Sequence, residues 1–322
     1  MEFNSIQDFK SNYIQVYHKE VLPSIEKYEQ ERKKTKIIYL VTKTFGVIAT
    51  IIVVLSFFNS YVYKLFFVEN KTFLSFIYFI LFILGPLALV LSSKIDKNFE
   101  NKFKKSIMPH LMKAFGDFQW TDSSVIDYFT IKLTTLFPRF NEKSDDDNFY
   151  GTYKGLGVNI SETKLTYSLQ TSKSSNTNDN IEFKGVIIEI DVKKPFKGHT
   201  IIRKREFINN NRAYQEIKLE DTEFTKQYYV DSNDQIESRY ILTPSFIERF
   251  KNLKQAFGGN SIQASFQNDK LIMAISMQKD IFKLADLSKP IADSKQFTKL
   301  LDEFSSILEI IDELKLNQNI GL

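Results

Sequence analysis

Two long uncharged runs constrain this 322-residue chain more than any other feature. Residues 44–63, TFGVIATIIVVLSFFNSYVY, and residues 72–93, TFLSFIYFILFILGPLALVLSS, contain no charged residue. A helix needs about 20 apolar residues to cross the hydrocarbon core of a bilayer. The alternative is a pair of buried helices in a soluble protein, but such helices rarely stay uncharged for so long. The runs therefore predict a transmembrane hairpin at residues 37–93, with spans at about 40–63 and 72–93.

Basic residues are concentrated beyond the outer ends of the two runs. They are Arg32, Lys33, Lys34 and Lys36 before the first run, and Lys94, Lys97, Lys102, Lys104 and Lys105 after the second. The short connection holds only Lys64, Lys71 and Glu69. Because positive charge favours the cytosolic side, we expect a multi-pass protein of the cytoplasmic (inner) membrane with both termini in the cytosol. A cleaved signal peptide is not indicated, since the first run begins far from Met1.

The runs contain no residue that marks an ion pathway. Asp, Glu, His and Arg are absent from both, and such residues line most intramembrane ion and proton paths. We therefore interpret the hairpin as an anchor in contact with membrane lipids. A homo-oligomeric pore is the alternative.

Amphipathic segments flank the hairpin. Residues 1–36 carry an apolar stripe that includes Tyr13, Tyr17 and Tyr28, and residues 94–140 carry another that includes Phe103 and Phe115. Their helical spacing predicts an N-terminal amphipathic cytosolic helix and a set of juxtamembrane helices, one of them capped by Asp122 or Ser123. We favour pairing of the two stripes with each other, and the alternative is that each lies flat on the lipid surface.

Residues 141–322 have the pattern of an α+β domain. Alternating apolar residues predict strands in 148–170, with the acidic run SDDDN at 144–148 as a solvated loop before them, and further strands in 181–192 and 199–207. The stretch KKPFKG at 193–198 is expected to be the turn of a hairpin, and Asn268-Asp269 the turn of another. Strands do not alternate regularly with helices, so the sheet is expected to be antiparallel.

Two helices are expected in this domain. One begins at Pro244, with Thr243 as N-cap and Gly258 as C-terminal stop. The other is an amphipathic helix at 297–314, whose apolar face either packs on the sheet or dimerises, and we favour packing. The fold class expected is thus an antiparallel α+β cytosolic domain, preceded by a two-helix transmembrane hairpin with helical extensions.

Several blocks of residues 130–282 resemble a known family. They are LTTLFPRFNEKSDDDNFYGTYKGLGVNISETKL, FKGVIIEIDVKKPFKGHT, LEDTEFTKQYYVDSNDQIESRYILTPSFIERF and SFQNDKLIMAISMQKDIF, in this order. The sequence is similar in these blocks to the bacterial domain of unknown function 3137 family, whose members commonly carry two membrane spans before this domain. The resemblance implies a membrane-anchored cytosolic module. It implies no activity and no catalytic residue.

Most common catalytic, metal-binding and nucleotide-binding motifs are excluded. Cysteine is absent, which removes thiolate metal sites and cysteine nucleophiles. The stretch GLGVNI at 155–160 has Ile where a dinucleotide loop needs its third glycine, and no other common nucleotide or hydrolase motif is present. The three histidines lie in separate segments, so no metal site or cofactor is expected. The net charge of +4 is too low to indicate nucleic acid.

Two small groups of polar residues remain as candidate sites. Lys193, Lys194, Lys197 and His199 form a basic cluster that could hold a phosphate or an anionic lipid headgroup. Glu237 and Arg239 combine an acid with a cation, a mixture used by active sites and by ordinary salt bridges alike. The alternative for the basic cluster is a solvated hairpin end without a binding role.

The sequence therefore predicts a membrane-anchored binding or scaffold module. Its ligand is expected to be a protein partner or anionic lipid, and a homo-oligomer is an alternative state. Whether it is an enzyme stays open, with a non-enzymatic role favoured. The alternatives are an enzyme with an unrecognised site that acts on a phosphate-bearing substrate, and a homo-oligomeric membrane channel or organiser.

Overall fold

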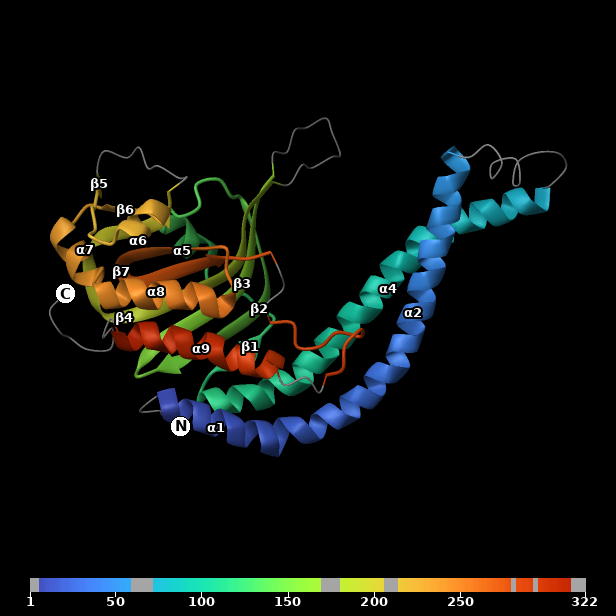
Figure 1. Cartoon of the computed structure of the whole chain (residues 1–322), viewed down its shortest axis with the longest axis horizontal. Coiled ribbons are helices and arrows are strands. Elements are labelled where there is room, and N and C mark those ends of the chain that lie inside the picture. Colours follow the sequence, from blue (N-terminus) through green and yellow to red (C-terminus); the bar gives the residue numbers. More distant parts are fainter. Residues whose placement is uncertain are drawn as a thin grey trace. The chain divides into compact units, whose positions relative to one another are not determined.

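A computed structural model describes the chain except for residues 1–5, 59–71, 169–179, 206–213, 279–281, 292–294 and 314–322. The chain folds into two compact units, whose elements are labelled in Figure 1. The sheet unit consists of Met1–Tyr17, Pro109–Phe282 and Lys295–Leu322, and the helical unit consists of His18–Met108 and Lys283–Ser294. Two segments named from the sequence lie almost wholly outside the described residues. One is the stretch that joins the two apolar runs, and the other is TSKSSNTNDN.

Two long helices form most of the helical unit, α2 (Leu22–Phe58) and α4 (Thr72–Met112). They run antiparallel and touch along their length. The rings of Tyr28 and Phe103 meet edge to face at 5.2 Å between centroids. Further along, a Cβ on Gly46 would lie 2.9 Å from the side chain of Leu89, so only glycine permits this close approach. The pairing that we predicted for the flanking segments thus continues the pairing of the apolar runs.

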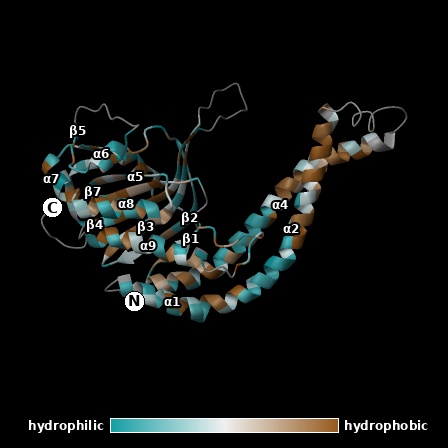
Figure 2. Cartoon of the chain, viewed as in Figure 1, coloured by the Kyte–Doolittle hydropathy of each residue, from teal (hydrophilic) through white to brown (hydrophobic). Residues whose placement is uncertain are grey.

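The apolar side chains of this hairpin mostly face outward. Large apolar residues are exposed over 37–58 of α2 and 76–91 of α4, with Phe58 86% and Phe76 61% exposed. Figure 2 shows these parts of both helices as mainly hydrophobic. Both helices are long and apolar enough to cross a membrane by length and composition. The two long apolar helices predicted from the sequence are therefore present.

A short irregular segment lies across the two helices within the helical unit. We call residues 283–291 the strap. The buried guanidinium of Arg32 donates to the carbonyl of Leu287 at 2.8 Å and pairs with Glu29 at 2.6 Å. Glu29 in turn accepts from the backbone N–H of Ile291 at 3.0 Å, and Asp96 of α4 accepts from that of Leu287 at 3.2 Å. The strap is thus hydrogen-bonded to both helices.

The N-terminal helix belongs to the sheet unit. Helix α1 (Ile6–Val16) leads into a π-helical turn (Tyr17–Val21), and α4 leads into a 3₁₀ turn (Lys113–Phe115). The rings of Tyr13 and Phe115 meet at 5.4 Å, and the Tyr13 hydroxyl donates to the carbonyl of Phe297 at 2.5 Å. These contacts pair the two amphipathic stripes in this unit also, as we favoured.

The sheet unit is built on one antiparallel sheet. Its described strands are β1 (Gln119–Thr121), β2 (Glu142–Tyr153), β3 (Leu156–Tyr167), β4 (Asn180–Lys204), β5 (Gln215–Glu216), β6 (Tyr228–Ser232) and β7 (Ser261–Ser276). Their order is β1-β2-β3-β4-β6-β5, and β7 pairs with β4. Every described pair is antiparallel, which confirms the predicted α+β class.

Strand β2 begins earlier than the sequence predicted. The acidic run at 144–148 lies within β2 and not in a loop before it, with a β-bulge between Asp145 and Asn148. The bulge gives the acids local partners: Asp145 accepts from Thr163 at 2.8 Å, and Asp147 accepts from the indole N–H of Trp120 at 2.8 Å. These bonds explain how an acidic stretch is accommodated in a strand. The β2–β3 hairpin itself turns at 154–155.

The two other predicted hairpins are wrong. Strand β4 runs through the expected turn at 193–198, and β7 runs through the expected turn at Asn268. The two strands pair lengthwise, from Gly185 with Ser276 to Ile202 with Ala264, and β4 contains five more residues than β7 between these pairs. The Pro-Phe-Lys-Gly stretch is therefore a large bulge, with Phe196 opposite Asn268. We call residues 192–199 the basic bulge.

Helices cover both faces of the sheet. Helices α8 (Pro244–Phe257) and α9 (Lys295–Glu313) lie side by side on one face (Figure 1). The ring of Phe304 of α9 meets that of Phe149 of β2 edge to face at 5.4 Å between centroids, so the apolar side of α9 packs within its own chain as we favoured. The other face is covered by residues 125–140, which include α5 (Tyr128–Leu133).

The helix ends follow local capping chemistry. Thr243 caps α8 and Gly258, with φ 64°, ends it, as predicted. Helix α5 begins later than predicted, because Asp127 and not Asp122 or Ser123 accepts from its first backbone N–H groups. Two short helices, α6 (Thr222–Gln227) and α7 (Gln235–Ile241), were not predicted.

Candidate functional site

The basic bulge is held by acceptor side chains from the segment before and within α7. The carboxylate of Glu237 accepts from the backbone N–H groups of Lys197 at 2.9 Å and Gly198 at 2.8 Å. The side-chain oxygen of Asn233 accepts from the N–H of His199 at 2.7 Å. Successive N–H groups that converge on one side form an anion-binding concavity. Here the protein's own carboxylate already occupies it.

The described lysine side chains of the bulge are exposed to solvent. Lys193 and Lys197 are exposed, whereas the side chain of Lys194 is not described. Lys193 lies beside the β2–β3 turn, since its Nζ is 3.7 Å from where a Cβ on Gly155 would be. Contact of Lys193, Lys194 and Lys197 with a phosphate stays a prediction. Such contact would use exposed side chains without help from the backbone N–H groups at 197 and 198.

His199 lies inside the protein. It is 3% exposed, and its Nδ1 and Nε2 lie 2.8 Å from the hydroxyl of Tyr214 and 2.9 Å from that of Ser265. Burial, helped by the nearby Arg203 cation, lowers the pKa of His199 to about 4, so the ring is neutral near pH 7. A phosphate contact by His199 would require one of these two hydrogen bonds to break.

A loose ion pair lies near His199 in the sheet. Arg203 of β4 and Asp231 of β6 are both buried, and their nearest charged atoms are 3.9 Å apart. Burial lowers the pKa of Arg203 and raises that of Asp231, against the attraction between the two charges. Arg203 is buried, whereas the next two residues of this stretch, Lys204 and Arg205, are exposed.

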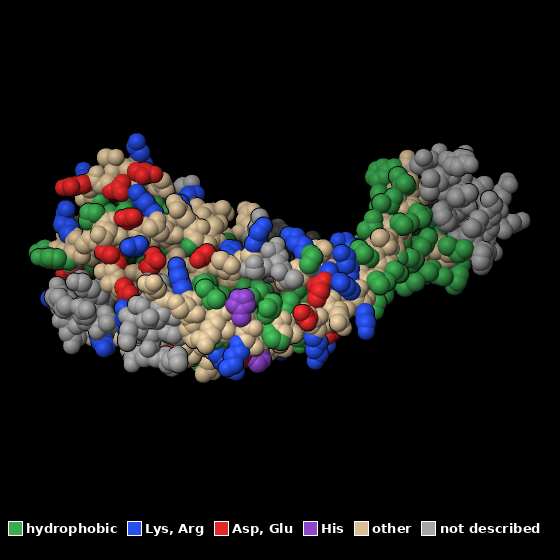
Figure 3. Space-filling view, turned by 60° about the horizontal axis from the view of Figure 1, so that its bottom comes forward, with side chains coloured by type: hydrophobic (Ala, Val, Ile, Leu, Met, Phe, Trp, Pro, Cys, Tyr) green, Lys and Arg blue, Asp and Glu red, His purple; other side chains and the backbone are tan. Residues whose placement is uncertain are grey.

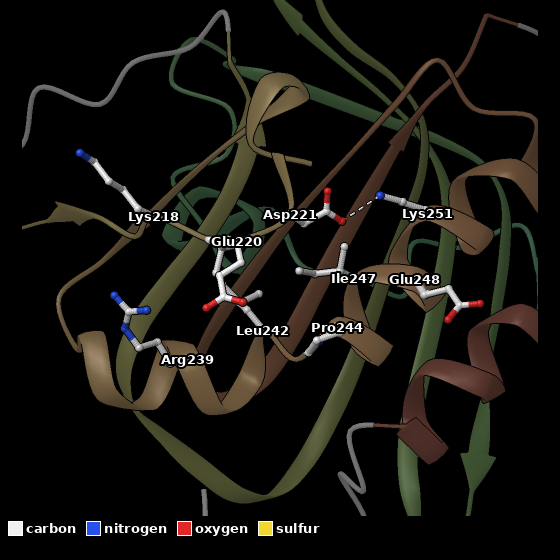
Figure 4. A pocket seen from close by; sticks show the side chains of 10 residues that line it. Lys218, Glu220, Asp221, Arg239, Leu242, Pro244, Ile247, Glu248 and Lys251 are labelled. Carbon is white, nitrogen blue, oxygen red and sulfur yellow. Dashed lines mark hydrogen bonds and ion pairs between the residues drawn. The ribbon is translucent and has the colours of Figure 1, made fainter. Parts of the chain in front are cut away.

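A pocket of about 320 Å³ opens beside α7 and α8. Its lining, drawn in Figure 4, consists of Lys218, Leu219, Glu220, Asp221, Arg239, Leu242, Pro244, Ile247, Glu248 and Lys251. Lys251 is already paired with Asp221 at 3.0 Å. Arg239 lines the pocket but Glu237 does not, because residues two apart on a helix point to different sides. The structure therefore does not bring the predicted acid–cation pair into one site.

The lining combines charge with apolar surface. Charged side chains of both signs, among them Glu220, Glu248 and Lys218, surround the apolar side chains of Leu219, Leu242 and Ile247. Asp221, whose side chain caps α6, has its pKa lowered by the backbone N–H of Phe224 and by Lys251, so it stays ionised. The pocket can hold a polar segment that also presents an apolar group.

Next to the pocket, α7 exposes an apolar pair. Ile236 is 72% exposed and Tyr240 is 65% exposed, and the four-residue spacing places them on one side of the helix. With Arg239 between them in sequence, this surface has residue types that are enriched at protein interfaces. We call Ile236, Arg239 and Tyr240 the α7 surface. We did not predict this surface from the sequence, although Asp234 followed by Glu237 has the spacing of a helix-capping pair.

A second buried titratable group lies under α9. Glu303 is 1% exposed, and burial raises its pKa to about 8, with the nearby Glu162 adding to the rise and Lys299, 3.3 Å away, opposing it. The sequence analysis missed this group, because an isolated Glu in an amphipathic helix normally faces solvent. Among the described residues no cluster of three or more His, Cys, Asp or Glu is arranged to hold a metal ion.

Comparison with known proteins supplies a family resemblance. Residues 181–316 match the family described as "Protein of unknown function (DUF3137)". The predicted resemblance is confirmed. The matched part runs from the start of β4 to beyond the described end of α9, so it begins and ends later than the blocks on which we based the prediction. No curated protein matches the chain.

One solved structure shows a distant likeness. It is the crystal structure of the mycobacterial trehalose monomycolate transport factor A, TtfA, which is 10% identical to this chain. The aligned part covers 62% of this chain and 90% of that one, with a TM-score of 0.32. A likeness at this level carries no argument about fold or function.

Proposed function

We propose that the protein is a membrane-anchored cytosolic binding module, with α2 and α4 as its two spans and both termini in the cytosol. The observation that supports this most is the outward-facing apolar surface of the hairpin over 37–58 and 76–91. In water, such a large exposed apolar surface would drive association or aggregation. In a bilayer the same side chains face hydrocarbon, and the backbone polar groups are satisfied within each helix.

The sheet unit would carry the recognition. Its α7 surface exposes Ile236 and Tyr240 beside a pocket that has charged walls and an apolar floor. Aromatic, arginine and large aliphatic side chains of this kind supply most of the binding free energy in protein interfaces. We therefore propose a protein partner as the ligand of this surface.

The test uses the tagged full-length chain produced in bacterial membranes. Alkaline carbonate extraction should leave it in the membrane pellet, and affinity capture in mild detergent should recover the same partner reproducibly. The double variant Ile236→Asp/Tyr240→Asp should lose that partner and stay in the pellet. Phe129→Asp/Leu133→Asp is the matched control, because these residues form an equally exposed pair on α5, 71% and 63% exposed.

Each part of the proposal can fail separately. Release of the wild-type chain by carbonate would contradict membrane anchoring. Equal loss of the partner from both double variants would contradict recognition by the α7 surface, because it would show that any charge on an exposed short helix disturbs binding.

A further inference from the structure

The helical unit has a basic collar directly beyond its apolar surface. On α2, the continuous run of exposed apolar residues begins at Ile37, and Lys33 and Lys34 lie within about one turn before it. On α4, exposed apolar residues end at Leu91, and Lys94 and Lys97 follow within two turns. At a rise of about 1.5 Å per residue, Lys97 lies about 9 Å beyond Leu91 along the axis. The headgroup layer is about 5–8 Å thick on each side of the hydrocarbon, so Lys97 lies just beyond it and its long side chain can reach back into the layer.

Four carboxylates on α2 and α4 are already paired with cations. The recorded pairs are Glu29 with Arg32 at 2.6 Å, Glu31 with Lys102 at 2.6 Å, Asp96 with Lys283 at 3.4 Å and Glu100 with Lys104 at 3.1 Å. Each of these four carboxylates on α2 and α4 therefore has a cationic partner within the helical unit. Glu26 of α2 and Asp286 of the strap also lie in this unit, but they are fewer than the four exposed lysines Lys33, Lys34, Lys94 and Lys97, so the remaining charge is positive.

The strap contacts some of the cations of α2 and leaves others exposed. It covers the side of α2 that carries Arg32, which is buried, and Lys36, whose ammonium donates to the carbonyl of Ser288 at 3.3 Å. Lys33 and Lys34 lie on the other sides of α2 and are exposed. Lys33, Lys34, Lys94 and Lys97 form no salt bridge with any residue that the structure describes. Figure 3 shows lysine and arginine side chains gathered next to the apolar part of the hairpin.

We propose that Lys33, Lys34, Lys94 and Lys97 form a site for the phosphodiester headgroups of anionic lipids. The inference rests on the proposed membrane anchoring and names a lipid class for it. It places lipid recognition at the base of the hairpin instead of at the basic bulge, where the backbone N–H groups are held by Glu237. A lysine ammonium suits this role, since a compact point charge on a flexible stem can follow mobile headgroups.

The test measures which lipids stay bound to the full-length protein. The chain is purified into micelles that contain equal amounts of phosphatidylglycerol and phosphatidylcholine, and retained lipids are counted by native mass spectrometry. The wild-type chain should retain phosphatidylglycerol preferentially. The quadruple variant Lys33→Gln/Lys34→Gln/Lys94→Gln/Lys97→Gln should lose this preference by tenfold or more, since each charge near an anionic surface is worth about fivefold in affinity.

The matched control removes charge from the basic bulge. Lys193→Gln/Lys197→Gln should keep the preference, and the two collar doubles, Lys33→Gln/Lys34→Gln and Lys94→Gln/Lys97→Gln, should each lower it partly. Preference lost in the bulge double and kept in the quadruple variant would overturn the proposal. Competition by millimolar soluble glycerol phosphate would also overturn it, because it would show a site for small anions and not for lipid.

Failure of this inference is distinguishable from failure of the proposed function. A wild-type chain that resists carbonate extraction but retains both lipids equally is anchored without headgroup selection, which contradicts only the lipid site. A wild-type chain that carbonate releases contradicts the anchoring itself.

Discussion

The carboxylate of Glu237 accepts a hydrogen bond of 2.8 Å from the backbone N–H of Gly198, and its other oxygen accepts from the N–H of Lys197. Glu237 is buried, so these two bonds hold the basic bulge against α7 in a site from which water is largely excluded. An acid in a helix has thereby fixed the conformation of a strand 40 residues away in the sequence.

Replacement of Glu237 by Gln should destabilise the sheet unit. An amide offers one acceptor oxygen, so one of the two N–H groups would be left facing a donor, and we expect a loss of about 1–3 kcal/mol in the free energy of unfolding. Urea unfolding of the full-length chain in micelles, followed by the fluorescence of Trp120, measures it. Arg239→Gln is the control, exposed and two residues away, and should change the free energy by less than about 0.5 kcal/mol.

The strap should depend on Arg32. Its guanidinium reaches both Glu29 and the carbonyl of Leu287, and a lysine ammonium cannot reproduce this planar set of donors. We expect Arg32→Lys to increase hydrogen exchange of the strap peptide severalfold and to leave exchange in the sheet strands unchanged. Lys33→Gln, at the adjacent exposed position, should leave the strap as protected as in the wild-type chain.

Glu303 should make stability fall as the solution becomes alkaline. Its unfolded pKa is near 4.5 and its folded pKa is about 8, so the folded state binds the extra proton between these values. Stability contributed by the protonated form is therefore full below pH 4.5 and decreases up to about pH 8, by at most about 1.4 kcal/mol per pH unit. Urea unfolding over this range should show the slope in the wild-type chain and a flatter profile in Glu303→Gln. An unchanged slope would show that the carboxyl of Glu303 ionises normally.

His199 should have the opposite effect in acid. Its folded pKa of about 4 lies below the ordinary value of 6.5, so the unfolded state binds the extra proton between these values. Stability therefore falls as the pH drops from 6.5 towards 4, because the buried neutral ring must be exposed to gain its charge. His199→Gln should remove this part of the profile even if it lowers stability at pH 7. A proton NMR titration that places the ring near 6.5 in the folded chain would contradict the assignment.

The elements predicted correctly are those that local chemistry determines. The apolar length of α2 and α4, the cap at Thr243 and the stop at Gly258 each depend on a few adjacent residues. The inward face of α9 was also predictable, since its apolar residues recur with helical spacing. For these elements the sequence and the structure agree.

The two wrong hairpins show where local chemistry is ambiguous. Asn268 has φ 53°, a conformation that suits both a tight turn and a bulge, and the Pro-Phe-Lys-Gly stretch also favours either. The lengthwise pairing of β4 with β7, which places Phe196 opposite Asn268, determines that both stretches lie within continuous strands and do not form turns. That pairing joins residues about 70 apart in the sequence, so no local pattern could reveal it.

The candidate sites were predictable only in part. The sequence identified the basic stretch, but the burial of His199 and the hydrogen bonds of Glu237 depend on contacts with Ser265 and with the backbone at 197 and 198. Glu237 and Arg239 were named together as a possible polar site, but only Arg239 lines the pocket. The strap and its bonds to Arg32 had no sequence signal that we recognised.

The most direct test of membrane anchoring is a map of which segments face each side of the membrane. The chain has no cysteine, so single-cysteine variants report one position each without background. In intact bacterial cells freed of their outer membrane, a membrane-impermeant maleimide should label Asn70→Cys, which lies between the two spans, and should label Ser124→Cys and Lys193→Cys only after lysis. Labelling of all three in unlysed cells, or of Asn70→Cys only after lysis, would contradict a hairpin anchored with the sheet unit in the cytosol.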